Sequence, residues 1–101
     1  MTQPSLETLC RTWQERLLLQ DWTVDIKFRP MDECWGLCEF YDDCDRASVT
    51  INPKNGPESY EFYVVHELLH LRQRKLKGTN HHIENAINLL TRSFLKAYKR
   101  K

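Results

Sequence analysis

The chain has 101 residues, 41% hydrophobic content and a formal net charge of +1, which is the composition of an ordinary folded domain with a modest core. Its apolar runs are short, and residues 1–4 have neither the basic start nor the apolar stretch of an export signal. We therefore expect one cytoplasmic domain over residues 1–101 without membrane insertion, and the net charge favours no class of partner.

The first expected element is an amphipathic helix over residues 4–20. Ser5 suits the N-cap, and apolar side chains recur at helical spacing, at Leu6, Leu9, Cys10, Trp13 and Leu17. Residues 22–29 then alternate between apolar and polar side chains, which is the period of a half-buried strand, and Pro30 ends it.

Two further short strands are expected, at residues 34–41 and 47–52. Gly36 interrupts the first of them and marks either a bulge or a point where another backbone comes close. The acidic turn between the strands holds Asp42, Asp43 and Asp45, but no glutamate follows at the position that closes a calcium-binding loop. We therefore expect a solvated turn there.

Two helices are expected to complete the chain. The first covers residues 58–76, with Pro57 at its start and Gly78 as its C-terminal cap. The second covers residues 81–99 after a cap at Thr79 or Asn80, and it carries one apolar stripe, formed by Ile83, Ala86, Ile87, Leu90, Phe94, Ala97 and Tyr98. This order predicts an α+β fold with a small, mostly antiparallel three-stranded sheet.

The strongest functional signal is the segment His66-Glu67-Leu68-Leu69-His70. Histidines four apart on a helix project from one face, close enough to bind a single zinc ion at roughly 2.0–2.1 Å. Glu67 lies about 100° further round the helix, so it points past the metal, where it can take a proton from a bound water. This is the HExxH pattern of zinc peptidases. The helix is apolar on most sides, and unpartnered histidines would be costly there, which favours a metal over satisfied core histidines.

A catalytic zinc needs a third protein ligand and an open fourth position. If the chain turns back at Gly78, the last helix runs beside the motif helix. The motif helix then rises about 9 Å from His70 to its end, and the last helix rises about 6 Å from its start to Glu84, so Glu84 lies nearly level with His70. Glu84 is therefore the expected third ligand. His81 and His82 are rival ligands, but they lie nearer the turn, and a surface position is expected for them.

The longer metzincin pattern is absent, because Gln73 and Leu76 occupy the positions three and six beyond His70. A HExxH motif followed by a glutamate on the next helix resembles the gluzincins. The short chain looks most like their smallest members, the minigluzincins, and is similar in pattern to the ImmA/IrrE-like metallopeptidases. These families place Glu-x-x-x-Asp/Asn on the second helix, and here the residues read Glu84-Asn85-Ala86-Ile87-Asn88.

The resemblance implies a minimal zincin-like domain that hydrolyses peptide bonds with one Zn²⁺ per chain. Glu67 would be the general base, and His66, His70 and Glu84 would be the ligands. Asn88 would be an outer-shell group that holds a ligand histidine. The alternative is a zincin-fold binding or regulatory module that is weakly active or inactive.

A peptide or protein substrate is expected to pair with a strand at the edge of the sheet, because zincins generally hold an extended substrate in this way. Residues 34–41 and 47–52 are both candidates for that strand. A further hydrogen-bond donor for the transition state is expected among His81, His82, Tyr60 and Tyr63, and no spacing singles one out.

Basic residues gather after the motif and at the end of the chain, which leaves nucleic acid open as a partner of the binding module. They are Arg72, Arg74, Lys75, Lys77, Lys96, Lys99, Arg100 and Lys101. A solvated helix end explains such a run equally well, and no known nucleic-acid-binding signature accompanies it.

The chain contains four cysteines, Cys10, Cys34, Cys38 and Cys44. The last three have the spacing C-x₃-C-x₅-C, which is no strong zinc pattern and lacks a nearby fourth ligand. In a reducing compartment all four are expected to be free thiols. A bridge between Cys38 and Cys44 across a hairpin is the one pairing left open.

Overall fold

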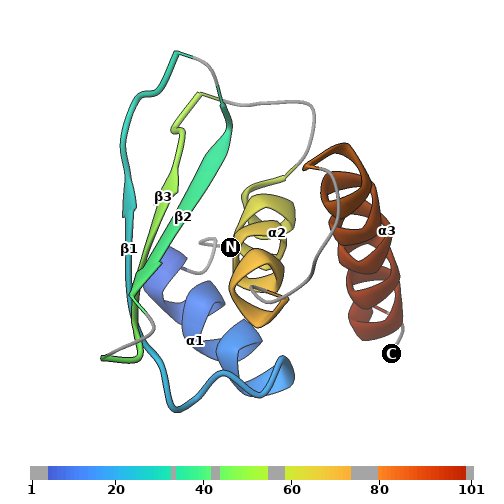
Figure 1. The fold of residues 1–101 in the computed structure, drawn as a ribbon, viewed down its shortest axis with the longest axis horizontal. Coiled ribbons are helices and arrows are strands. Elements are labelled where there is room, and N and C mark those ends of the chain that lie inside the picture. The colour runs from blue at the N-terminus through green and yellow to red at the C-terminus, as the bar shows by residue number, and fades with distance from the viewer. Residues whose placement is uncertain (1–4, 33, 42–43, 55–58, 74–79, 100–101) are drawn as a thin grey trace.

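The structure is a computed structural model that describes residues 5–32, 34–41, 44–54, 59–73 and 80–99. The elements run in the order α1 (Leu6–Arg16), β1 (Thr23–Phe28), β2 (Gly36–Tyr41), β3 (Arg46–Ile51), α2 (Tyr60–Arg72) and α3 (Asn80–Lys99) (Figure 1). The predicted α+β class and the predicted order of elements are therefore confirmed.

Helix α1 begins where the sequence indicates and ends earlier than expected. The Ser5 hydroxyl accepts a hydrogen bond of 3.2 Å from the backbone N–H of Thr8, so Ser5 is the N-cap. The helix ends at Arg16 because Leu18 adopts a left-handed conformation, with φ of 60°. This turn exposes Leu18 and buries both Leu17 and Leu19 in the core.

The sheet is mixed, and its strand order is β1-β3-β2. Strand β3 is parallel to β1 and antiparallel to β2, so the expectation of a mostly antiparallel sheet is wrong. The physical reason is the path of the chain. It runs from β1 to the opposite edge at β2 and returns between the two, so β3 has the direction of β1.

The central strand β3 supplies the most deeply buried part of the sheet. Ala47, Val49 and Ile51 alternate along it and are at most 1% exposed, which is the period-two pattern of a strand with one face on the core. Because β3 is paired on both sides, the sheet edges lie at β1 and β2.

Asn52 fixes the segment that leads into β2. Its side-chain amide donates hydrogen bonds to the carbonyl oxygens of Met31 (2.6 Å) and Cys34 (3.1 Å), and its backbone N–H donates to the carbonyl oxygen of Trp35 (2.9 Å). Asn52 is only 3% exposed, and these bonds satisfy it. The start of β2 is therefore tied to the end of β3.

Helix α2 is the central element of the molecule. It lies between the sheet and α3 and packs against α1, α3, β2 and β3 (Figure 1). Ser59 caps it by accepting a hydrogen bond of 3.1 Å from the backbone N–H of Phe62. Contacts on several sides explain why its residues from Phe62 to Leu69 are all buried. The sequence-based expectation of a helix buried on most sides is thus confirmed.

Helix α3 packs on α2, and of the predicted apolar stripe Ile83, Ile87, Leu90 and Phe94 lie in or against the core, whereas Ala97 and Tyr98 are exposed. Ile87 and Thr91 are fully buried, and the Thr91 hydroxyl is satisfied because it donates to the carbonyl oxygen of Ile87 at 2.7 Å. Leu89 on the other side of the helix is exposed. Glu84, three residues before Ile87, lies at the polar edge of this stripe.

Several sequence-based expectations concern residues outside the described ranges. These residues are Pro57, Gly78 and Thr79, the turn residues Asp42 and Asp43, and the basic residues Arg74, Lys75, Lys77, Arg100 and Lys101. The expected bounds of 58–76 for the motif helix are wrong, because α2 begins after the Ser59 cap and ends at Arg72 with Gln73 as its C-cap. Among the helices that the structure describes, none is both long and apolar enough to cross a bilayer.

Candidate metal centre

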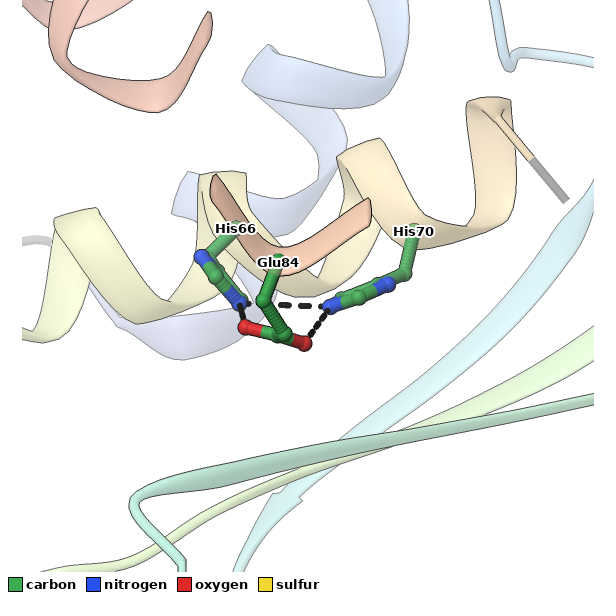
Figure 2. A group of neighbouring side chains, drawn as sticks. All are labelled: His66, His70 and Glu84. Carbon is green, nitrogen blue, oxygen red and sulfur yellow. Dashed lines mark hydrogen bonds and ion pairs between the residues drawn. The ribbon is translucent and has the colours of Figure 1, made fainter. Parts of the chain in front are cut away.

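His66, His70 and Glu84 converge on one point between α2 and α3. The two histidines project from the same face of α2, one turn apart, and Glu84 reaches between them from α3 (Figure 2). The Nε2 atoms of the histidines are 3.2 Å apart. Glu84 places one carboxylate oxygen 3.2 Å from His66 Nε2 and the other 2.7 Å from His70 Nε2. The predicted set of three ligands is therefore brought together.

The three side chains fit a divalent metal such as zinc. Ligand atoms around a tetrahedral zinc with bonds of about 2.1 Å lie about 3.4 Å apart, and the donor atoms here are separated by similar distances. The set of two imidazole nitrogens and one carboxylate is that of many catalytic zinc sites. In the described part of the chain, no other group of histidine, cysteine or acidic residues converges in this way.

The environment of His66 favours its neutral form. Burial lowers the pKa of this imidazole below its usual value, and the nearby His70 lowers it further, whereas the Glu84 carboxylate opposes both effects. A neutral imidazole has the free lone pair that a metal needs. His66 is therefore suited to ligation at neutral pH.

Packing against Phe62 supports the ring of His66 in addition to its contact with Glu84. Phe62, one turn earlier on α2, stacks on it with 6.0 Å between ring centres and 23° between planes, and the Arg92 guanidinium lies 5.3 Å from the Phe62 ring. Asn88 is near enough to raise the pKa of His66. However, the buried Nδ1 of His66 has no hydrogen-bond partner among the described residues, so the aromatic stack is the clearer support.

Glu67 lies beside the three-residue cluster and is not part of it. Its side chain faces the cavity next to the cluster, and the residue is only 6% exposed. Burial, reinforced by the negative charge of Glu84, raises the pKa of Glu67 to about 8. Glu67 is therefore a buried carboxyl group with a raised pKa that lies next to the candidate metal ligands and outside their cluster.

A cavity of about 670 Å³ opens over these residues. Strand β2 and its preceding segment form one wall, and α2 and α3 form the others. The lining is largely apolar around a polar centre, and it comprises Cys34, Trp35, Gly36, Leu37, Cys38, Phe40, Phe62, Tyr63, His66, Glu67, His70, Gln73, Ile83, Glu84 and Asn88. The cavity is large enough to hold a peptide bond together with the side chains of the residues on either side of it.

The four candidate hydrogen-bond donors differ in their position relative to the cavity. Tyr63 lines the cavity, with its ring against Trp35 and Phe62. Tyr60 lies elsewhere, because its hydroxyl donates to the carbonyl oxygen of Pro53 at 2.7 Å and its ring packs on Phe28. His82 is exposed and outside the lining, and the side chain of His81 lies outside the described part of the structure.

All four cysteines are free thiols, so the bridge left open between Cys38 and Cys44 is not formed. Cys34 and Cys44 are exposed, Cys38 lines the cavity, and Cys10 is buried on the inner face of α1. Burial raises the pKa of the Cys10 thiol to about 11.

Alkylation of the native protein is expected to distinguish these thiols by rate. Cys34 and Cys44 should react first because they are exposed. Cys10 should react at least about 100-fold more slowly than an ordinary exposed thiol, since a pKa of about 11 leaves about 100-fold less thiolate and burial blocks access. Mass spectrometry of protein alkylated without prior reduction, first native and then unfolded, measures both properties. If only two thiols are modified after unfolding, the other two cysteines form a disulfide.

No family model, curated protein or solved structure matches the chain.

Proposed function

We propose that the chain is a zinc-dependent endopeptidase. The observation that carries the proposal is the convergence of His66, His70 and Glu84, from two helices, beside a buried glutamate in a cavity. The resemblance of the motif and of the Glu84 helix to the minigluzincins and the ImmA/IrrE-like metallopeptidases supports the same assignment. A cytoplasmic location, in which the four thiols stay reduced, belongs to this proposal.

Each side chain has a distinct role in this proposal. His66, His70 and Glu84 would hold the ion. Zinc, when bound, supplies the Lewis acid that lowers the pKa of water to about 7 and polarises a peptide carbonyl. Glu67 would accept the proton from the attacking water and pass it to the leaving amine, because its buried carboxyl group lines the cavity beside the candidate ligands. Among the candidate donors whose side chains the structure describes, Tyr63 is the one that lines the cavity, and it would stabilise negative charge on the substrate carbonyl.

The strand arrangement favours β2 as the substrate-binding edge. Of the two candidate strands, β3 is paired on both sides and offers no free backbone edge. Strand β2 lies at the edge of the sheet and lines the cavity beside the candidate ligands. An extended peptide that adds to β2 would gain main-chain hydrogen bonds, and its side chains would enter the largely apolar cavity.

The test is hydrolysis of an unfolded protein such as casein by the purified chain. We expect cleavage that a chelator abolishes and that stoichiometric zinc restores, whereas magnesium does not, since its preferred octahedral oxygen sites differ from this one. Gel electrophoresis and mass spectrometry of the products measure it. Zinc binding without any hydrolysis would instead favour the alternative of an inactive binding or regulatory module.

A further inference from the structure

Gly36, the first residue of β2, lies directly against the side chain of Glu67. A Cβ atom placed on Gly36 would be 2.8 Å from Oε2, 3.1 Å from Cγ and 3.2 Å from Cδ of Glu67. Gly36 pairs with Ile51 in regular register, so the bulge considered for this glycine is absent. The close neighbour is a side chain rather than another backbone.

Both partners in this contact are held by their surroundings, and only the Glu67 side chain has open space beside it, in the cavity. Glu67 is buried, and the contact involves its Cγ and Cδ at 3.1 and 3.2 Å as well as the terminal oxygen at 2.8 Å, so turning the carboxyl group alone does not relieve all three contacts and the side chain itself must shift. Gly36 is held in the sheet, and Asn52 ties the preceding segment to β3. An added methyl group must therefore displace the Glu67 carboxyl towards the cavity and Glu84, or push β2 away from α2.

We propose that Gly36 is a positioning residue, whose lack of a side chain leaves the space in which the Glu67 carboxyl lies beside the His66, His70 and Glu84 cluster. The consequence for hydrolysis rests on the proposed function, but the contact itself does not. The same strand that would bind the peptide then also sets the position of the general base. Strand β2 would therefore position both the substrate peptide and the Glu67 carboxyl that acts on it.

A double-mutant cycle in thermal stability tests the contact without any assay of hydrolysis. In the native background, Gly36→Ala should lower the Tm by about 4–8 °C, the shift of a moderate destabilisation in a domain of this size. In a Glu67→Ala background the same change should leave the Tm equal or slightly higher, because the clashing atoms are gone and alanine is otherwise preferred to glycine in a strand. Glu39→Ala, on the same strand but outside the cavity, is the control that should show no dependence on the background.

The outcomes of the cycle are distinct. An equal loss of Tm in both backgrounds would show that Gly36 serves its own backbone or the sheet, and would overturn the proposal. If Gly36→Ala alone does not fold, folding of the double variant Gly36→Ala/Glu67→Ala supports the proposal, and failure of both variants overturns it.

Metal content and hydrolysis test the functional consequence. Gly36→Ala should keep one zinc per chain by elemental analysis and lose casein hydrolysis about 100-fold, the effect of a displacement near 1 Å at a reacting group. Loss of zinc would mean that Gly36 supports the metal cluster, and native rates would mean that it does not position Glu67; either result overturns the proposal. Absence of hydrolysis in the native protein contradicts the proposed function instead, while the stability cycle still decides whether Gly36 fixes Glu67.

Discussion

Glu67→Gln is expected to leave one zinc bound per chain and to reduce casein hydrolysis by about 10²–10⁴-fold, the usual contribution of a general base. Glutamine has nearly the shape of glutamate, so its side chain can occupy the same space against Gly36. The amide cannot accept the proton of the attacking water. The carboxyl group is also not one of the three converging ligands, so metal binding should be unaffected. Parallel measurements of zinc content and of initial hydrolysis rate check the prediction.

The matched control for this variant is Glu39→Gln. Glu39 is exposed on β2 and is not part of the cavity lining, so the same chemical change there should alter neither zinc content nor rate. Loss of zinc in Glu67→Gln would identify Glu67 as a ligand and contradict the mechanism proposed for it.

The convergence of the candidate ligands was predictable because it depends on local geometry. His66 and His70 are four residues apart on one helix, which fixes their common face whatever surrounds them. Glu84 followed from the rise of two antiparallel helices on either side of a short connection. These predictions used helix dimensions, the position of one break and the place of Glu84 at the polar edge of its helix, and the three side chains do meet in the structure.

The sheet was less predictable, because strand order depends on contacts that are distant in sequence. Alternation identified the strands and their buried faces, but it has the same form in a central and in an edge strand. Only the observed pairing shows that β3 lies between β1 and β2, and hence that β2 is the edge beside the cavity. The early end of α1 has a similar cause, since burial of Leu17 and Leu19 outweighs continuation of the helix.

The contacts of individual side chains around the site could also not be predicted from the sequence pattern. Tyr60 and Tyr63 are one turn apart on α2, and the pattern does not reveal that only Tyr63 reaches the cavity. Phe62 was missed as the residue that stacks on His66, although its position four residues earlier was an available signal. Gly36 was expected to mark a bulge or the close approach of another backbone, whereas the group that approaches it is the side chain of Glu67.

Removal of one ligand is expected to abolish stoichiometric zinc binding. His66→Ala and Glu84→Ala should each reduce zinc content from one ion per chain to a substoichiometric level and remove hydrolysis with it. Two remaining protein ligands cannot hold the ion as three do, and those left in His66→Ala are exposed to competing water, with side-chain exposures of 25% for His70 and 49% for Glu84. Elemental analysis after gel filtration measures the stoichiometry.

A stability measurement gives an independent readout of the same site. A ligand that binds only the folded state adds about 4 kcal/mol to the free energy of unfolding when its free concentration is 1,000 times the Kd. Zinc should therefore stabilise the native chain strongly and leave His66→Ala and Glu84→Ala nearly unchanged. His82→Ala is the matched control, because His82 is an exposed histidine on α3 outside the cluster, and this variant should respond to zinc like the native chain. An undiminished zinc response in His66→Ala or Glu84→Ala would place the metal elsewhere and would contradict the assignment of this centre.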